Sequence, residues 1–307
     1  WLTTTPDCQT SGTLVINVRG EDRRFIHAFG ANARFDGTEI PADLIRQSRC
    51  LYVGGFFLMP QLTSARVVEL FRQARDAGIP TLLDVVIPDP THCWRELQQV
   101  LPWTDVFLPN VDEGRMITGL ADPLAQARAF REAGAGTVVI TRGSAGSVLA
   151  DQEGILRAGR FEVEFVDGTG SGDAFAAGYI AGLLDGCTSR RCLEIGSALG
   201  ASCVRSAGAT TGVFTRLGKV HGNRMVDVAV TNAKLEDRAL RILRDLADVP
   251  RDQGRTLLEA SSGSVKQALV MALTGLDAEP AATALAEHGP SLRSTLAALD
   301  YRLKAPQ

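Results

Sequence analysis

The sequence predicts an α/β protein with a doubly wound, mostly parallel sheet, followed by a small all-α C-terminal domain. Two observations predict this fold class. Strand-like and helix-like segments alternate over the first two thirds of the chain, and the strand-like runs are continuously apolar, as in a sheet covered by helices on both faces. From Thr231 onward no strand pattern remains. We place the boundary near Arg216, which gives domains at 1–216 and 217–307.

The expected elements follow in order along the chain. Strands are predicted at 13–20 and 23–30, joined by a short Gly-Glu-Asp turn, then at 50–55, 81–86, 105–110 and 137–143, with short strands between 146 and 165. Helices are predicted at 64–77, 124–133, 170–184, 190–205, 235–246, 254–260, 265–273 and 291–303. Candidate helix starts are Thr231-Asn232 and Ser264, and candidate stops are Gly263 and Gly275.

Composition and charge limit the class of protein. Hydrophobic residues make up 45% and charged residues 22%, which is typical of a folded globular chain. The net charge of -3 indicates no nucleic-acid surface, and no apolar stretch reaches membrane-spanning length. The six cysteines form no Cys-x-x-Cys pair, so we expect reduced thiols and a cytoplasmic setting. We therefore expect no nucleic-acid partner and no membrane partner.

The glycine-rich stretch 168–175, GTGSGDAF, is the strongest chemical motif. It lies between a predicted strand and a predicted helix, where the N–H groups of Gly170, Ser171 and Gly172 and the helix dipole favour a phosphate. Asp173 falls in the first helical turn. A carboxylate there either caps the helix, a contribution of about 1 kcal/mol, or accepts a proton from an attacking hydroxyl. The P-loop pattern is absent, and the dinucleotide fingerprint needs Gly where this chain has Asp173.

This loop resembles the second signature of the PfkB, or ribokinase-like, carbohydrate kinases, DTxGAGD followed by a small apolar helix. Asp167, Thr169, Gly170, Gly172 and Asp173 match it, whereas Gly168 replaces Thr and Ser171 replaces Ala. Other motifs occur in the family's order: PNVDEGRMITG at 109–119, TRGSAGSVL at 141–149 and SALGASCVRSAGA at 197–209. The resemblance covers about residues 10 to 215 and implies a ribokinase-like fold.

The resemblance also implies catalytic roles. Asp173 would be the general base that deprotonates a sugar hydroxyl as its oxygen attacks the γ-phosphate of ATP, a small-molecule reaction. The backbone N–H groups of Gly170, Ser171, Gly172 and Asp173 would stabilise the charge that develops on the phosphoryl oxygens. Asn110 and Glu113 would organise Mg²⁺ and its waters.

Further residues match binding positions of the family. Thr141, Gly143 and Gly146 would contact the nucleotide. Asp167 and Thr169 match positions that bind a monovalent cation in some members. Ser197 and Gly208 fall in the helix and the Gly-Ala turn that lie beside adenine, although ribokinases often carry Asn where this chain has Ser197.

Several of these residues also admit a structural interpretation. Asn110 and Glu113 could be an ordinary helix start, and 141–143 a simple turn at the end of a strand. Asp84 closes a predicted strand; we assign it a structural role by default, with the alternative that it faces the cleft. His92 is interpreted as a residue without a metal-binding or catalytic role. His27 is interpreted as a half-buried polar residue on a strand.

The first part of the chain departs from the family pattern. The family begins with a sugar-binding region that carries an early Gly-Asp pair and a GGxxxN signature, and this sequence has neither. Its own start resembles the lid strands of the family and the Gly30-Ala31-Asn32 segment that follows them. With Trp1 as first residue, these features predict an N-terminally truncated kinase domain with low or no turnover and an unassigned sugar.

The last part of the chain resembles another family. The string N-x-M-V-D-V-x-x-T-N-x-K-L, at 223–235, is similar to the C-terminal helical segment of N-acetylmuramic acid 6-phosphate etherases. That family's catalytic acids belong to a preceding domain that we do not find, so Asn223, Asp227, Asn232 and Lys234 are interpreted as structural. The segment could serve in homodimer formation or docking, and its fusion to a kinase indicates amino-sugar or cell-wall sugar metabolism.

Three functional hypotheses remain open from the sequence. The first is an ATP-dependent carbohydrate kinase that acts on a sugar hydroxyl. The second is a non-catalytic sensor of a nucleotide or sugar phosphate. The third is a relative of the etherases in which the kinase region is a passenger.

Overall fold

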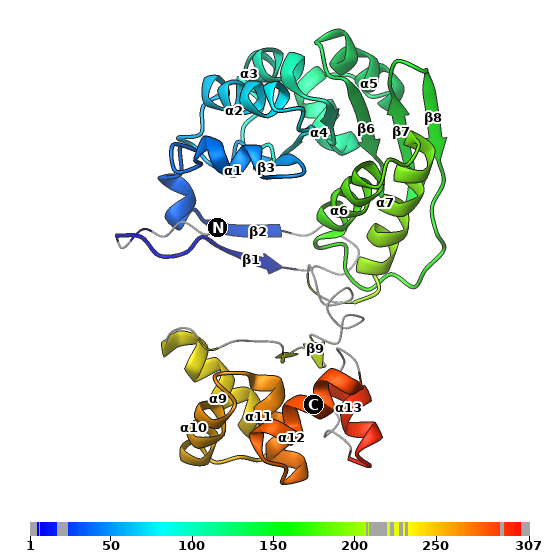
Figure 1. Ribbon diagram of the computed structural model, residues 1–307. Helices are drawn as coiled ribbons and strands as arrows, with labels where there is room; N and C mark the ends of the chain where they lie inside the picture. Colours follow the sequence, from blue (N-terminus) through cyan, green and yellow to red (C-terminus); the bar gives the residue numbers. More distant parts are fainter. Residues whose placement is uncertain are drawn as a thin grey trace. The chain divides into compact units, whose positions relative to one another are not determined.

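The computed structural model describes residues 5, 7–16, 24–206, 208, 220–221, 224–226, 230, 233–288 and 292–301. The chain divides into two compact units, which are described one at a time (Figure 1). Unit 1 comprises 1–162 and 172–201, and unit 2 comprises 163–171 and 202–307. The predicted turn at 20–22, the boundary at Arg216, the helix start at Thr231-Asn232, and residues Asn223 and Asp227 lie outside the described residues, as does the side chain of Lys234.

The centre of unit 1 is a six-stranded sheet in the order β3-β4-β5-β6-β7-β8. Pairing is parallel from β3 to β6 and antiparallel from β6 to β8, so the predicted α/β class with a mostly parallel sheet is confirmed. The strands are β3 (Leu51–Phe56), β4 (Thr81–Val85), β5 (Val106–Phe107), β6 (Thr137–Thr141), β7 (Ser147–Ala150) and β8 (Ile155–Ala158). β5 is shorter than predicted, and 159–165 forms no strand.

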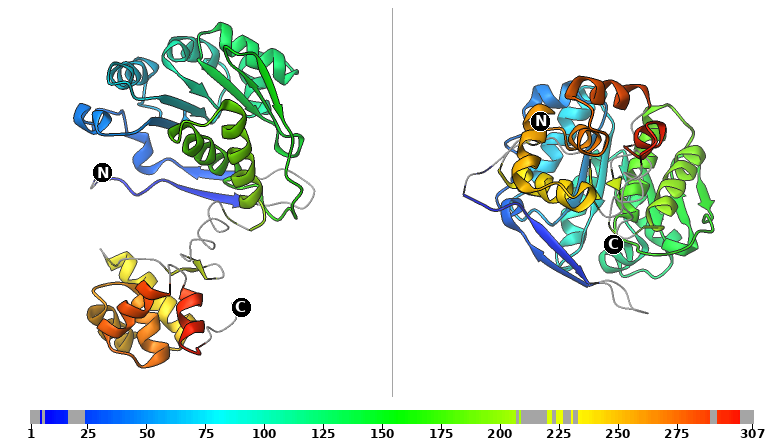
Figure 2. Two further views of the ribbon diagram at one scale, coloured as in Figure 1. Left: turned by 45° about the vertical axis from the view of Figure 1, so that its right-hand side comes forward. Right: turned by 90° about the horizontal axis from the view of Figure 1, so that it is seen from below.

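Helices cover both faces of this sheet (Figure 2). One face packs against α2 (Ser64–Asp76), α3 (Cys93–Val100), α4 (Val111–Thr118) and α5 (Pro123–Glu132). The other packs against α6 (Ser171–Leu184) and α7 (Ser189–Cys203). The short helices α1 (Ala42–Arg46) and η2 (Leu101–Trp103) lie in the connections.

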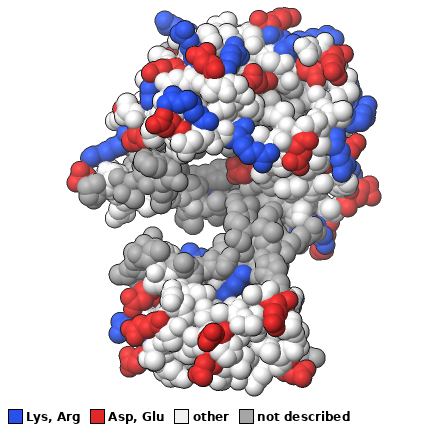
Figure 3. Space-filling model, in the orientation of Figure 1, with Lys and Arg blue, Asp and Glu red and all other residues white. Residues whose placement is uncertain are grey.

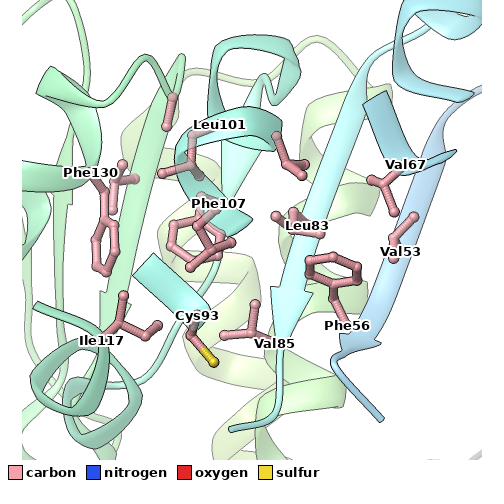
Figure 4. Packing of buried hydrophobic residues seen from close by; sticks show 14 of the residues in the cluster. Val53, Phe56, Val67, Leu83, Val85, Cys93, Leu101, Phe107, Ile117 and Phe130 are labelled. Atoms are coloured by element: carbon pink, nitrogen blue, oxygen red, sulfur yellow. The ribbon is translucent and has the colours of Figure 1, made fainter. Parts of the chain in front are cut away.

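Adjacent strand residues point into different cores. Leu83 of β4 packs with Phe107 and Phe130 on the α2 to α5 side (Figure 4), whereas Leu82 packs with Phe175 on the α6 side. Because successive side chains of a strand alternate between faces, a strand buried on both faces must be apolar at nearly every position. This burial explains the continuous apolar runs of the sequence.

A separate antiparallel pair precedes the main sheet. β1 (Gly12–Ile16) pairs with β2 (Arg24–Ala28), with Leu14 opposite Ile26. The 3₁₀ helix η1 (Gly30–Ala33) follows and contains the Gly-Ala-Asn segment. The two strands predicted at the start of the chain are thus present and paired.

Unit 2 contains a helical core. Its elements are α9 (Ala233–Ala247), α10 (Arg251–Ala260), α11 (Val265–Thr274), α12 (Ala278–Glu287), α13 (Leu292–Ala298) and the short strands β9 (Val220–His221) and β10 (Arg224–Met225). Leu240, Leu243 and Leu269 are among its fully buried side chains. The predicted start of α11 is confirmed, since the Ser264 side chain accepts a hydrogen bond from the backbone N–H of Gln267. α12 was not predicted, because its Ala-rich sequence carries no broad apolar stripe.

The surface charge of unit 1 and the apolar character of the helices also bear on the class of protein. Acidic and basic side chains are interspersed on the face of unit 1 that Figure 3 shows. Within the described part of the chain, no helix by itself combines the length and the apolar character needed to cross a membrane. Among the described helices, α11 and α12 taken as a pair meet the length and composition needed, and they bend by 109° at their break.

Candidate functional site

The candidate site of unit 1 lies where the parallel strands end. Asp84 is near the end of β4, Asn110 follows β5, and Thr141 closes β6. Because these strands run parallel, their carboxyl ends share one edge of the sheet, the usual place for ligands in open α/β folds. Asn110 and Thr141 are also joined directly by a parallel bridge.

Asp173 lies in the first turn of α6, as predicted. Its side chain is exposed, yet the protein around the carboxylate partly removes it from water and raises its pKa. Electrostatic interactions connect Asp173 with Tyr52 and Asp84. The first turn of α6 therefore lies close enough to Tyr52 of β3 and Asp84 of β4 for their charges to interact.

Asp84 and Tyr52 form a hydrogen-bonded pair in this region. The Tyr52 hydroxyl donates to Asp84 Oδ2 at 3.2 Å, and the backbone N–H of Val85 donates to Asp84 Oδ1 at 2.7 Å. Burial raises the pKa of Asp84 to about 6, although both hydrogen bonds act to lower it. The sequence interpretation gave Asp84 a structural role by default and did not single out Tyr52. The signal in the sequence was a titratable side chain in each of two strands that consist mainly of apolar residues.

Asn110 and Glu113 form a capping box at the start of α4. Asn110 Oδ1 accepts from the backbone N–H groups of Asp112 and Glu113, both at 2.9 Å. Glu113 Oε2 accepts from the backbone N–H of Asn110 at 2.8 Å. Burial, with smaller contributions from the charges of Asp84 and Asp112, raises the pKa of Glu113 to about 8, although its hydrogen bonds with Asn110 act to lower it.

Thr141, Gly143 and Gly146 lie in the connection between β6 and β7. Gly143 begins the 3₁₀ helix η3 (Gly143–Ala145), with φ of 53°. Gly146 has φ of 82°, and its backbone C=O accepts from the N–H of Arg142 at 2.8 Å. A side chain at Gly146 would overlap the backbone of Ala158 in β8. The turn therefore holds its backbone close to β8 at the same edge as Asn110.

In unit 2, Asp167 ties the segment before α6 to residue 208. Its buried carboxylate accepts from the N–H and hydroxyl of Thr169, at 3.0 and 2.8 Å, and from the N–H of Gly208 at 2.9 Å. Gly170 then adopts φ of 76°, and the Ser171 N–H donates to the C=O of Gly168 at 3.2 Å. This chain of bonds fixes the backbone that enters α6.

Two further predicted site residues, Gly172 and Ser197, lie on the helices that cover the sheet. Gly172 lies in the first turn of α6 with open space around it, and Ser197 is half-buried on α7. Within unit 1 the structure therefore brings Asp173, Glu113 and Asp84 to one region, with Asn110 and Thr141 adjoining it. It groups Asp167, Thr169 and Gly208 within unit 2.

The carboxylates of unit 1 fit a hard cation such as Mg²⁺. None of the ion pairs formed by the described residues includes Asp84, Glu113 or Asp173, and burial raises the pKa of each. Among the described residues, however, no three His, Cys, Asp or Glu side chains are placed to hold a metal ion by themselves. This arrangement suits Mg²⁺, which keeps several waters and usually takes the rest of its ligands from substrate phosphates.

The fold is that of an α/β protein with a candidate anion and carboxylate site at the carboxyl edge of its sheet. Residues 1–216 match the model of the pfkB family of carbohydrate kinases, and the chain belongs to that family. The resemblance inferred from the sequence motifs is confirmed.

Solved structures show the same fold at low identity. A PfkB protein from Polaromonas sp. JS666 matches with a TM-score of 0.55 and 24% identity, over 68% of this chain and 71% of that chain. Ribokinase from Thermotoga maritima matches with a TM-score of 0.56 and 20% identity, over 67% of this chain and 66% of that one. A ribokinase II candidate from E. coli, solved in complex with ATP and Mg²⁺, matches with a TM-score of 0.57 and 23% identity, over 66% of this chain and 67% of that one.

The second predicted resemblance is confirmed as well. The chain is 64% identical over 88 residues to N-acetylmuramic acid 6-phosphate etherase of Prochlorococcus marinus (strain MIT 9303), and 58% identical over 87 residues to that of Synechocystis sp. (strain ATCC 27184 / PCC 6803 / Kazusa). These matches span 29% and 28% of this chain, and the chain spans only 28% of the length of each etherase.

Proposed function

We propose that the protein transfers the γ-phosphoryl group of ATP to a hydroxyl of a sugar, with Asp173 as general base. The single observation that carries the proposal is the position of Asp173, in the first turn of α6 and close enough to Asp84 of β4 for their charges to interact. Family membership and the ATP-bound relative support the nucleotide.

The residues of the site would act on the acceptor hydroxyl, on the transferred phosphoryl group and on the nucleotide. A carboxylate oxygen of Asp173 accepts the hydroxyl proton while the hydroxyl oxygen attacks the γ-phosphorus. The bond from the γ-phosphorus to the bridging oxygen breaks, and ADP leaves. The backbone N–H groups of Gly170, Ser171, Gly172 and Asp173, at the start of α6, stabilise the charge on the transferred group. Thr141, Gly143 and Gly146 would contact the nucleotide.

Bound Mg²⁺ would neutralise phosphate charge. Glu113 would hold it or its waters, since only Oε2 of that carboxylate is engaged by the cap. Asn110 would act through its reciprocal hydrogen bonds with the Glu113 residue, which set the direction of the carboxylate.

A second observation favours one class of acceptor. The etherase-like portion of the chain is 64% identical to proteins whose named substrate is the 6-phosphate of an N-acetylated amino sugar. A kinase that phosphorylates such a sugar makes a product of that chemical class. We therefore propose an N-acetylated amino sugar as acceptor and draw no etherase activity from a likeness that covers 28% of those relatives.

Sugar-dependent ADP release tests the proposal. The intact chain is assayed with ATP and Mg²⁺ against N-acetylmuramic acid, N-acetylglucosamine, ribose and fructose, and ATP binding is measured by calorimetry. Because the sequence predicts low turnover for this chain, we expect slow ADP release that is fastest with an amino sugar, and a loss of at least ~10²-fold in kcat for Asp173→Asn with unchanged ATP affinity.

Three results would contradict parts of the proposal. Persistent turnover in Asp173→Asn would exclude Asp173 as the base. ATP binding without ADP release for any sugar would favour the non-catalytic sensor. Failure to bind ATP would remove the kinase function altogether.

A further inference from the structure

Cys203 is the last residue of α7, and its thiol contacts the loop that enters α6. The side chain is fully buried, and its S–H donates to the backbone C=O of Thr169 at 3.4 Å. The C=O of the next residue, Val204, accepts from the backbone N–H groups of Val166 and Asp167 at 2.8 and 3.2 Å. All of these residues belong to unit 2, where residues 203–204 therefore hold the loop at two places.

The second of these contacts falls on the central peptide of a β-turn at residues 168–171. The Ser171 N–H closes the turn on the C=O of Gly168 at 3.2 Å, and Gly170 has φ of 76°. This φ belongs to the third residue of a type II turn, whereas in a type I turn that residue has φ of about −90°. The two types differ by a rotation of the peptide between Thr169 and Gly170 through about half a turn. Glycine takes both signs of φ about equally well, so residue 170 does not itself select one orientation.

The thiol of Cys203 decides which side of this peptide carries the N–H. A peptide unit is planar and trans, so its C=O and N–H point in opposite directions. Because Cys203 binds the C=O of Thr169, the N–H of Gly170 is directed away from Cys203. No backbone C=O among the described residues accepts a hydrogen bond from this N–H, which leaves it available to a ligand. In the opposite orientation the turn would present a carbonyl oxygen there, which repels phosphate oxygens.

We propose that Cys203 is a positioning residue for phosphoryl transfer: its thiol fixes the turn in the orientation that directs the Gly170 N–H at the transferred phosphoryl group. The inference rests on the proposed function, in which this N–H stabilises the charge on that group. Preorganised donors stabilise a transition state because they need no reorientation while the charge develops. Without the thiol the turn exchanges between its two orientations, and part of that stabilisation is lost.

Cys203→Ala tests the inference, because it removes the donor to the Thr169 C=O, and Cys203→Ser supplies a donor again. Cys192→Ala is the matched control: Cys192 is a buried cysteine of the same helix, and its thiol donates to the C=O of Cys187 at 3.7 Å. In Cys203→Ala we expect kcat to fall about two- to fivefold, the effect of one weak hydrogen bond, with little change in KM. Affinity for ADP with aluminium fluoride and Mg²⁺, which imitates the transition state, should fall by the same factor, and affinity for ADP alone should not change.

An NMR measurement reports on the turn without turnover. The whole chain is labelled with ¹³C at the threonine carbonyls and ¹⁵N at the glycine amides, so that only Thr-Gly pairs give a signal. The sequence has four such pairs, at 118–119, 169–170, 211–212 and 274–275. The 169–170 signal should move in Cys203→Ala and return in Cys203→Ser, and it should stay in place in Cys192→Ala. The signals of 118–119 and 274–275 should stay in place in all three variants.

Three outcomes overturn the inference: an unmoved 169–170 signal in Cys203→Ala, a moved signal with unchanged kcat, or an equal loss of kcat in Cys203→Ala and Cys192→Ala. A wild-type chain that binds no ATP contradicts the proposed function, and the 169–170 signal still decides whether Cys203 sets the turn.

Discussion

Asn110 and Glu113 cap one another. The side chain of Asn110 accepts from the backbone N–H of Glu113 at 2.9 Å, and the side chain of Glu113 accepts from the backbone N–H of Asn110 at 2.8 Å. The string that resembles a magnesium motif is therefore also a capping box. The two interpretations are compatible, because the cap fixes one carboxylate oxygen and with it the direction of the other.

The raised pKa of Glu113 predicts a pH-dependent stability. Its native pKa of about 8 exceeds the ordinary 4.5, so the native state binds this proton more tightly than the unfolded chain does. Stability should therefore fall as pH rises from about 4.5 to about 8. In thermal unfolding without Mg²⁺, the Tm of Glu113→Gln should fall less between pH 5.5 and pH 8 than the Tm of the wild type. Glu132→Gln, an exposed acid of α5, is the control; parallel slopes for wild type and Glu113→Gln would contradict the assignment.

Removal of the Asn110 cap should destabilise unit 1. Asn110→Ala leaves the N–H groups of Asp112 and Glu113 without their acceptor and should cost about 0.5–2 kcal/mol in urea unfolding. Asn110→Asp retains an acceptor oxygen at the helix start and should restore most of that loss. Equal stability of Asn110→Ala and wild type would show that the cap contributes nothing.

Gly114 is required by a buried glutamine. Gln126 is fully buried, and its side-chain amide donates to the C=O groups of Val111 and Leu120 at 3.0 and 2.8 Å, which joins α4 to α5. A methyl group at Gly114 would overlap Gln126 Oε1. Gly114→Ala should therefore cost about 1–3 kcal/mol despite the better helix propensity of alanine. Gly159→Ala, in open space, should stay within about 0.5 kcal/mol, and an equal effect of both in urea unfolding would refute the overlap.

Gly143 and Gly146 should differ in tolerance although both have positive φ. Gly143 has open space where a side chain would be, so Gly143→Ala should cost only the backbone strain of about 1–2 kcal/mol. At Gly146 the added Cβ would also meet the backbone of Ala158, so Gly146→Ala should cost more. Chemical unfolding of both variants measures the difference. A Gly143→Ala variant less stable than Gly146→Ala would reverse the expected order.

Local signals predicted those parts of the fold that depend on neighbouring residues. The cap of α11 was predicted at Ser264 because the bond it makes spans only three residues, to Gln267. The sequence analysis offers Asn110 and Glu113 as a helix start without predicting the extent of α4, and it does not predict α3. Each helix is only eight residues long, which is too short for a repeated apolar pattern. The predicted strand extends to Asn110, beyond the end of β5 at Phe107, because Leu108 and Pro109 continue the apolar run. The Leu108 N–H still donates to the C=O of Leu83 at 3.0 Å, and the Pro109 C=O accepts from the N–H of Thr141 at 3.1 Å.

The residue pattern alone predicts the α/β class, the family motifs and the candidate base. Burial on both faces imposes continuous apolar runs, and the glycines of the loop at 168–175 mark a backbone that turns sharply before a helix. The side chains that surround the candidate base follow from the packing of the strands and helices. Tyr52 and Asp84 are separated by 32 residues along the chain and meet through the register of two parallel strands. Asp173 joins them from a helix much later in the sequence. Such proximity is set by strand pairing and helix packing, which no local pattern records.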